Sequence, residues 1–155
     1  LGIEAPFLLT VGTRWPRKNM GLAIDAVESL SQDLPHRLLV TGNSCWGEAR
    51  VGARTIATGY VSNELLCALY SAAELYLAPS RHEGFGIPVL EAWRCGTPAV
   101  CGPGGALPEV VQDPAAILPD FEVATWSGAI LDLLQNPSKL RQMAERGSRR
   151  ERGFT

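Results

Sequence analysis

The chain has 155 residues, of which 46% are hydrophobic and 19% charged, and its formal net charge at neutral pH is −2. This balance is typical of one soluble globular domain with a single core, and it does not indicate a nucleic-acid partner. No apolar stretch approaches the roughly 20 residues of a membrane-spanning helix, so we expect no integral membrane segment and a cytoplasmic protein.

A basic loop follows the first predicted strand. Phe7–Val11 is apolar enough for an interior strand, and the loop Gly12–Asn19 carries Arg14, Arg17 and Lys18. Ligands of open α/β sheets bind at the carboxyl ends of parallel strands, where these three cations could hold a diphosphate. An ordinary solvated loop is the other interpretation of the same residues.

The following segments alternate between helix and strand. Apolar periodicity and the bounding Gly, Pro and Ser residues predict a helix from Met20 to about Ser31, strands at Arg37–Thr41 and Arg54–Thr58, a helix from Ser62 to about Ala73 and a strand at Leu75–Ala78. The crossover between the second and third strands has only about a dozen residues and begins with the turn-rich segment Gly42–Gly47. It is barely long enough for a helix.

The stretch from Pro79 to Pro103 is the centre of the predicted site. Gly84 and Gly86 flank Phe85 in a loop whose backbone can approach a ligand closely. Pro88 then suits the first turn of a helix, which we expect to end near Gly96. The amides at such a helix start favour anions.

Two carboxylates accompany this glycine loop. Glu83 precedes it and Glu91 lies in the helix, with seven residues between them. Carboxylates beside an anion site could accept hydrogen bonds from sugar hydroxyls. The same residues also allow a simpler interpretation, in which Glu83 is a solvated charge, Glu91 pairs with Arg94 and the glycines only make a turn.

The C-terminal part completes the sheet and adds helices. We expect a strand at Ala99–Cys101, a flexible turn at Gly102–Gly105, a short helix near Pro108–Val111, a last strand at Ala115–Leu118, and helices at Val123–Leu134 and from Pro137 to Arg150. The glycines match neither the dinucleotide nor the P-loop pattern. The arginine-rich end also contains glutamates, which favours a solvated helix face over a membrane surface, and we expect this end to fray.

The cysteines and histidines form no recognisable metal-binding pattern. None of the four cysteines has Cys-x-x-Cys spacing, and the two histidines are His36 and His82. A zinc site or a disulfide framework requires more regular spacing. We therefore expect free thiols in a reducing compartment, no metal ion and no cofactor.

Several of these segments together resemble one family. The segment Glu83–Ala92, EGFGIPVLEA, resembles the Glu-x7-Glu signature of the retaining family-four glycosyltransferases, whose GT-B fold has two Rossmann-like domains. Val11–Asn19 resembles the basic phosphate loop of that family, Gly59–Ser62 its base-contacting turn and Ala106–Val111 the turn after its catalytic strand. The motifs occur in the family's order and cover nearly the whole chain.

The resemblance implies the fold and the activity. Residues 1–155 would form one donor-binding domain, a three-layer α/β/α Rossmann-like unit with a mostly parallel sheet of about six strands, and the N-terminal acceptor domain would be absent from this chain. The full-length enzyme would transfer a sugar from a UDP- or GDP-sugar to a glycan or lipid-linked saccharide, without a metal, in the cytoplasm or at the inner face of the membrane. The isolated domain would bind donor but transfer nothing.

The resemblance also assigns roles to residues. Arg17, Lys18 and Glu83 would be catalytic, and donor-binding residues would be Gly12, Val61, Ser62, Gly84, Phe85, Gly86, Ile87 and Glu91. Arg14 competes with Arg17 as the arginine that binds phosphate, because Thr13 stands where many relatives have their first basic residue. Two other functions share these features: the half of a related sugar-nucleotide epimerase, and a non-catalytic Rossmann-like interaction module.

Overall fold

A parallel sheet forms the centre of the protein. The computed structural model describes residues 1–43 and 51–154, and within them the sheet has five strands in the order β3-β2-β1-β4-β5, every neighbouring pair parallel. The strands are β1 (Phe7–Val11), β2 (Arg37–Thr41), β3 (Thr55–Gly59), β4 (Leu75–Ala78) and β5 (Ala99–Cys101). The expected mostly parallel α/β sheet is therefore confirmed.

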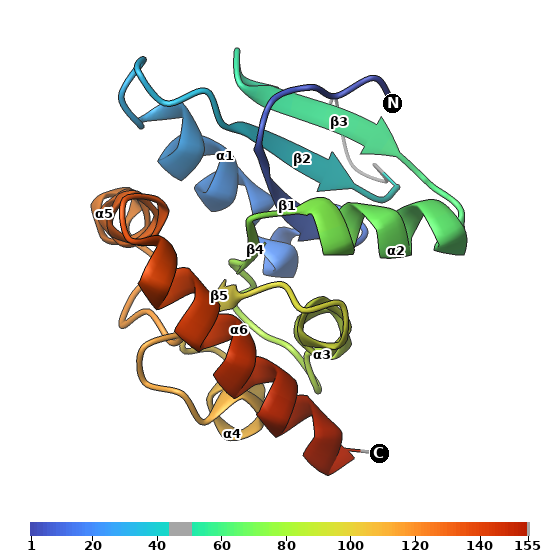
Figure 1. Cartoon of the computed structure of the whole chain (residues 1–155), viewed down its shortest axis with the longest axis vertical. Coiled ribbons are helices and arrows are strands. Elements are labelled where there is room, and N and C mark those ends of the chain that lie inside the picture. The colour runs from blue at the N-terminus through green and yellow to red at the C-terminus, as the bar shows by residue number, and fades with distance from the viewer. Residues whose placement is uncertain (44–50, 155) are drawn as a thin grey trace.

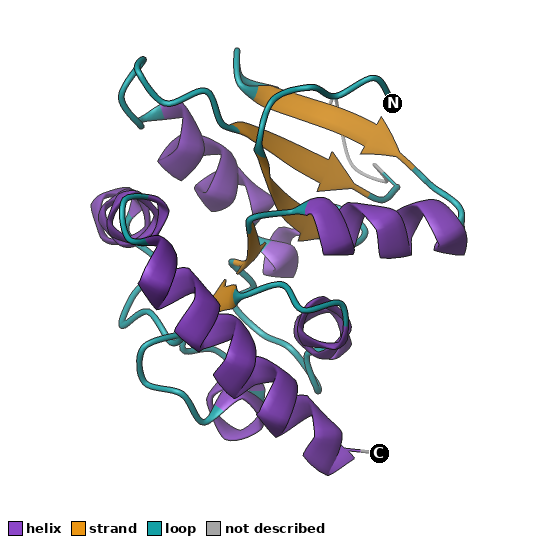
Figure 2. Ribbon diagram, in the orientation of Figure 1, coloured by secondary structure: helices purple, strands orange, loops and turns teal. Residues whose placement is uncertain are grey.

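Helices cover both faces of this sheet (Figures 1 and 2). They are α1 (Met20–Glu28), α2 (Asn63–Ala72), α3 (Ile87–Arg94), α4 (Leu107–Val111), α5 (Val123–Leu134) and α6 (Pro137–Glu151), with 3-10 turns η1 (Pro16–Lys18) and η2 (Arg152–Phe154). Helices α1 and α5 pack together on one face, α2 and α3 lie on the other, and α6 packs beside α3 and α5. This is the expected three-layer α/β/α arrangement.

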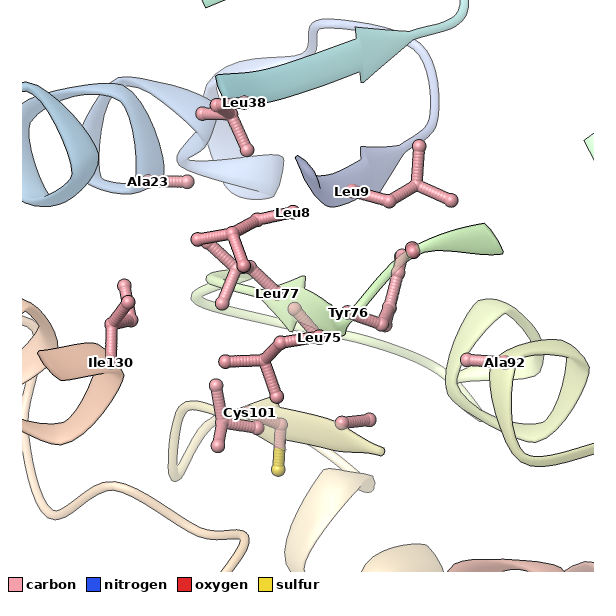
Figure 3. Packing of buried hydrophobic residues seen from close by; sticks show 14 of the residues in the cluster. Leu8, Leu9, Ala23, Leu38, Leu75, Tyr76, Leu77, Ala92, Cys101 and Ile130 are labelled. Carbon is pink, nitrogen blue, oxygen red and sulfur yellow. The ribbon is translucent and has the colours of Figure 1, made fainter. Parts of the chain in front are cut away.

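The core fills the space on both sides of the central strands. Leu8 and Leu77 point toward the α1 and α5 side, whereas Leu9 and Tyr76 point toward Ala92 of α3 (Figure 3). All of these side chains are buried. Strands covered on both faces read as continuous apolar runs, which is why Phe7–Val11 and Leu75–Ala78 could be recognised from sequence.

The strand order places a crevice between β1 and β4. The chain adds β2 and β3 on one side of β1 and then returns to add β4 and β5 on the other. The connections that follow β1 and β4 therefore lead to helices on opposite faces of the sheet, α1 and α3. In open α/β sheets this switch point is where ligands bind.

The expected sixth strand is reduced to a single bridge. Ile117 bridges Cys101, and the flanking hydrogen bonds run from the Cys101 amide to the Ala116 carbonyl and from the Leu118 amide to the Cys101 carbonyl, each 2.8 Å long. Pro114 and Pro119 bracket the segment. The Ala116 amide donates to the Asp113 carbonyl at 2.9 Å instead of to β5, so the ladder does not continue toward Pro114.

Other boundaries differ by a few residues. Helix α1 ends at Glu28 instead of Ser31, because the Ser29 hydroxyl donates to the Ala26 carbonyl at 2.8 Å and the Leu30 amide donates to the Val27 carbonyl instead. Strand β3 begins and ends one residue later than expected. The crossover loop expected after Gly42 falls largely on residues 44–50, outside the described residues.

The C-terminal end is packed, so the expectation that it frays was wrong. Glu151 is buried and paired with Arg94 of α3, and the Ser148 hydroxyl donates to the Trp93 carbonyl at 3.0 Å. Arg150 donates to the Val110 carbonyl at 2.9 Å. Arg146, which pairs with Asp113, and Arg150 thus contact other parts of the protein. Within the described residues, no helix is both long and apolar enough to cross a membrane.

Candidate functional site

Two loops meet at the switch point of the sheet. The loop after β1 tightens into η1, which carries Arg17 and Lys18, and the loop after β4 carries Ser80, His82 and Glu83 before α3 begins. The Arg81 amide donates to the Arg17 carbonyl at 2.8 Å, so the two loops are joined backbone to backbone. This contact fixes the cations of one loop against the carboxylate of the other.

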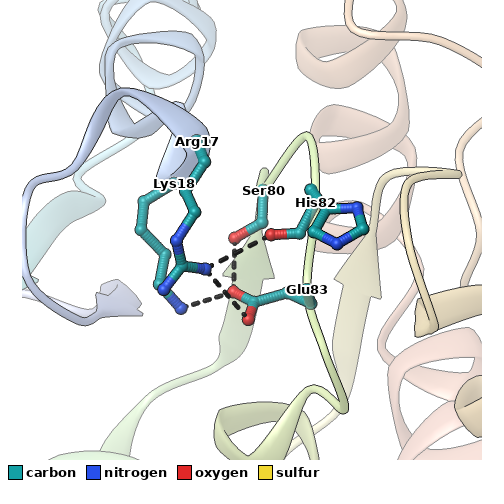
Figure 4. A network of polar contacts seen from close by, with 5 residues as sticks. All are labelled: Arg17, Lys18, Ser80, His82 and Glu83. Carbon is teal, nitrogen blue, oxygen red and sulfur yellow. Dashed lines mark hydrogen bonds and ion pairs between the residues drawn. The ribbon is translucent and has the colours of Figure 1, made fainter.

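The Glu83 carboxylate is the centre of a polar cluster (Figure 4). Its Oε1 accepts hydrogen bonds from Lys18 Nζ and, at 2.7 Å, from Ser80 Oγ. Arg17 Nη1 lies 3.6 Å from Glu83 Oε2 and donates to the His82 carbonyl at 3.3 Å. Lys18 and Glu83 each expose only 12% of their side chains. Glu83 is therefore a held, largely buried carboxylate, and the interpretation as a solvated charge was wrong.

The environment of Glu83 favours its charged form. Burial of the carboxyl raises its pKa, but the hydrogen bonds from Lys18 and Ser80 and the positive charges of Lys18 and Arg17 outweigh burial, so the pKa lies below its usual range. At neutral pH the cluster therefore combines two cations with one carboxylate. Its net positive charge suits an anionic ligand.

A third loop, after β5, packs against the Glu83 loop. The Ala106 amide donates to the Glu83 carbonyl at 2.9 Å. A Cβ on Gly104 would lie 2.0 Å from the Arg81 carbonyl oxygen, and one on Gly105 would lie 2.5 Å from the Glu83 carbonyl oxygen. These glycines were expected to make a flexible turn. Their role in the structure is to permit close backbone packing.

A small pocket opens beside the cluster, where β1 and β4 end. Its wall includes Thr10, Lys18, Tyr76, Glu83 and Gly86. The first turn of α3 begins at this wall, after Gly86 in a left-handed conformation with φ 87°. Backbone amides at a helix start carry partial positive charge, so the pocket is lined by anion-binding groups of two kinds.

Glu91 lies separately on the exposed side of α3. Its Oε2 accepts a hydrogen bond from the Tyr70 hydroxyl of α2 at 3.0 Å. The expected alternative, a pair between Glu91 and Arg94, is not what the structure shows, because Arg94 contacts Glu151. None of the described contacts joins the carboxylates of Glu83 and Glu91.

The remaining predicted donor-binding residues lie at the same edge of the sheet. Gly12 packs against the stem of Lys18, to which a Cβ would come within 3.5 Å. Ser62 caps α2, its hydroxyl accepting from the Leu65 amide at 3.2 Å, and Val61 precedes it after β3. β3 lies two strands away from β1, and no described contact joins Val61 or Ser62 to the Glu83 cluster.

The apolar residues of the glycine loop are partly exposed. Phe85 exposes 46% and Ile87 58% of its surface, and Gly84 has open space where a Cβ would be. The Phe85 ring packs edge-on against Phe154 of η2, with ring centroids 5.6 Å apart. The C-terminal turn thus supports the loop that the sequence identified.

Arg14 and Arg17 occupy different surroundings. Arg17 faces Glu83, whereas the Arg14 amide donates to the Asn43 carbonyl at 3.1 Å and the Arg14 Nε is buried without a hydrogen-bond partner among the described residues. Only Arg17 of the two joins the cluster. The described residues also contain no group of three or more His, Cys, Asp or Glu that could hold a metal ion.

Two side chains of this region were not predicted to have roles. Ser80 lies two residues after β4 and holds Glu83, and its position just beyond a buried strand was the signal that could have identified it. Tyr70 lies within the helix predicted from Ser62 to about Ala73 and is buried there. Its hydroxyl, unlike a leucine side chain, requires a hydrogen-bond partner when buried, and that requirement was the missed signal.

The comparisons with known proteins agree with this geometry. Residues 3–150 match the family described as glycosyl transferases group 1. The chain belongs to this family. The resemblance to a glycosyltransferase is thereby confirmed. The structure superposes on sucrose-phosphate synthase from Thermosynechococcus elongatus with a TM-score of 0.83 and 26% identity, over 99% of this chain and 42% of that one. This superposition confirms the Rossmann-like GT-B domain.

Two curated relatives show how much of a glycosyltransferase is present. The chain is 34% identical to the O-antigen chain mannosyltransferase B of Escherichia coli over 96% of its own length and 42% of that protein. It is 35% identical to the D-inositol 3-phosphate glycosyltransferase of Kineococcus radiotolerans over 97% of its length and 41% of that protein. The chain therefore spans about two fifths of the length of these relatives.

Proposed function

We propose that this chain is the donor-binding half of a retaining glycosyltransferase. The observation that carries the proposal is the cluster at the switch point, in which Arg17 and Lys18 from one loop face Glu83 from another beside the start of α3. Cations and helix-start amides that converge on one pocket are suited to a diphosphate. A nucleoside-diphosphate sugar, UDP- or GDP-linked, supplies that group.

The cations would act on the leaving group. As the bond between sugar and diphosphate breaks, negative charge grows on the diphosphate, and Lys18, Arg17 and the amides of Gly84 and Gly86 would stabilise it. Because the transition state carries more of this negative charge than the ground state, preorganised donors stabilise it more and so lower the barrier. The proposal assigns this task to side chains and amides instead of a bound metal ion.

Glu83 would face the donor sugar. In the free protein its carboxylate neutralises Lys18, so the diphosphate must take over part of that contact when the donor binds. The Ser80 hydroxyl and the Ala106 amide keep the Glu83 side chain and backbone in place during the exchange. Glu83 could then accept from sugar hydroxyls or stabilise positive charge near the anomeric carbon.

The nucleoside would extend from the diphosphate along the carboxyl edge of the sheet. Glu91 would accept from the ribose hydroxyls, and the backbone at Val61 and Ser62 would lie beside the base. The name of one relative, O-antigen chain mannosyltransferase B, supports a glycan or lipid-linked saccharide as acceptor. A lipid-linked acceptor would place the full-length protein at the inner face of the membrane, on its cytoplasmic side.

A transfer assay tests the proposal. The full-length protein, given a nucleotide sugar and an acceptor, should form a product whose anomeric configuration matches that of the donor, as measured by proton NMR. The 155-residue chain alone should bind the donor without forming product, because it spans only about two fifths of the length of the relatives. Inversion at the anomeric carbon would refute retention. Conversion of the donor without acceptor would identify an epimerase instead.

A further inference from the structure

A buried tyrosine holds one oxygen of Glu91. The Tyr70 hydroxyl, on α2, donates to Glu91 Oε2 on α3 at 3.0 Å. Tyr70 is 2% exposed, whereas Glu91 is exposed, so the contact links a fixed core group to a carboxylate that faces solvent. A hydrogen bond to a charged acceptor is stronger than one between neutral groups.

The position of Tyr70 is set by the core. Its ring packs against that of Tyr76, with centroids 5.6 Å apart, and its carbonyl accepts a hydrogen bond from the Thr97 hydroxyl. Burial, followed by the nearby Tyr76 and the negative charge of Glu91, raises the pKa of the Tyr70 hydroxyl well above its usual range. The hydroxyl therefore stays protonated at neutral pH and remains a donor.

Glu91 has no other anchor among the described contacts. Arg94, one turn further along α3, is occupied by Glu151, and no ion pair to Glu91 occurs in the described part of the chain. A glutamate on an exposed helix face samples several rotamers, and fixing it on binding costs affinity. The bond from Tyr70 restricts these rotamers before any ligand arrives and leaves Oε1 unoccupied by Tyr70.

We propose that Tyr70 is a positioning residue, which orients the Glu91 carboxylate to receive the hydroxyls of a nucleotide ribose. The inference rests on the proposed function and deepens it, because it assigns the discrimination between ribose and deoxyribose to the Tyr70–Glu91 pair. Tyr70 contacts no ligand and acts only through Glu91. A purely structural role would stabilise the fold without affecting that discrimination.

The test compares ribose preference in matched variants. Calorimetry measures binding of UDP, GDP and ADP, each with its 2′,3′-dideoxy counterpart, to the wild-type chain, Tyr70→Phe, Thr97→Val and Glu91→Gln. Tyr70→Phe removes only the hydroxyl, and Thr97→Val removes the other hydroxyl bond that holds this part of α2 while leaving Glu91 untouched. Thermal melts of each variant report the structural effect separately.

We expect Tyr70→Phe to weaken ribonucleoside diphosphates about two- to tenfold, the cost of immobilising one free side chain, and the dideoxy forms less than about twofold. Combined with Glu91→Gln, it should reduce ribose preference no further. Thr97→Val should lower the melting temperature but keep the preference. An unchanged ribose preference in Tyr70→Phe would overturn this inference and leave the proposed function standing. The same holds if Tyr70→Phe reduces ribose preference equally in the wild-type and Glu91→Gln backgrounds. Absence of nucleoside-diphosphate binding by the wild-type chain would refute the proposed function as well.

Discussion

Removal of the Lys18 ammonium should separate diphosphate binding from nucleoside binding. Lys18 exposes 12% of its side chain and donates to Glu83, which is equally buried. A hydrogen bond to a charged partner contributes about 1.5–3 kcal/mol, so Lys18→Ala should weaken a nucleoside diphosphate about 10- to 150-fold. The parent nucleoside, which has no phosphate, should lose little.

The variant also removes a neighbour of Glu83. Without Lys18, the nearest cation to that carboxylate is Arg17, 3.6 Å away and with half of its side chain exposed. The incompletely compensated Glu83 would then repel the diphosphate, which adds to the loss. The double variant Lys18→Ala, Glu83→Gln should therefore bind diphosphate better than Lys18→Ala alone.

Isothermal calorimetry at fixed ionic strength measures these affinities, because salt screens charge contacts. The chain offers a matched control, since its second lysine, Lys139, pairs with Asp132 on the surface and is 54% exposed. Lys139→Ala should change diphosphate affinity less than about twofold. If Lys18→Ala weakened nucleoside and nucleoside diphosphate alike, the assignment of Lys18 to phosphate would be wrong.

Three further outcomes are expected. Glu91→Gln should weaken ribonucleoside diphosphates about tenfold, by calorimetry, while their dideoxy forms change little; equal losses would exclude the ribose role. Gly105→Ala, at φ +62° with its Cβ 2.5 Å from the Glu83 carbonyl oxygen, should lower the free energy of unfolding by more than the roughly 1–2 kcal/mol of left-handed strain. Its control, Gly128→Ala, lies in open space on α5 and should raise the free energy of unfolding by about 0.5–1 kcal/mol. Equal stabilities of the two variants in urea melts would contradict the packing of the third loop. Folding lowers the pKa of Glu83, so its charge stabilises the fold above the unfolded pKa of about 4.3, and that stabilisation is lost as pH falls through the folded pKa. Glu83→Gln should therefore lose less stability than wild type between pH 6 and 3. Equal losses in the two proteins would show that Glu83 is not held as described.

Much of the fold was predictable because both strand and helix signals were local. The buried strands β1 and β4 are almost entirely apolar, and Ser62 and Pro137 mark helix starts at the expected positions. The sixth strand was not predictable, because pairing at Ile117 depends on how far the edge of β5 reaches. Local pattern does not carry that information.

The order of the loops was predictable, but their mutual contacts were not. Glu83 and Lys18 could be nominated separately, whereas their pairing depends on β1 and β4 being neighbours, a property of strand order. The role of Gly105 likewise requires the loop after β5 to pack against the Glu83 backbone. Tyr70 illustrates the same limit, because the sequence predicts the helix that contains it and not the carboxylate that its hydroxyl contacts.

The C-terminal end shows where charge pattern was misleading. A run of arginines and glutamates at a chain end resembles a solvated, fraying helix. Here Gly147 allows α6 to approach Trp93, where a Cβ would lie 2.3 Å from the indole, and the charges then find partners on α3 and α4. Long-range complementarity decided the outcome.

The central claim, that this chain binds a nucleotide-sugar donor, is tested most directly by thermal unfolding with UDP, GDP, ADP, their sugars and NAD. A ligand at about 100 times its dissociation constant adds about 2.7 kcal/mol, which for a chain of this length raises the melting temperature by roughly 5–10 °C. We expect one nucleoside diphosphate and its sugar to raise it selectively and NAD to leave it unchanged. No rise with any nucleoside diphosphate at millimolar concentration would contradict the claim and favour an interaction module.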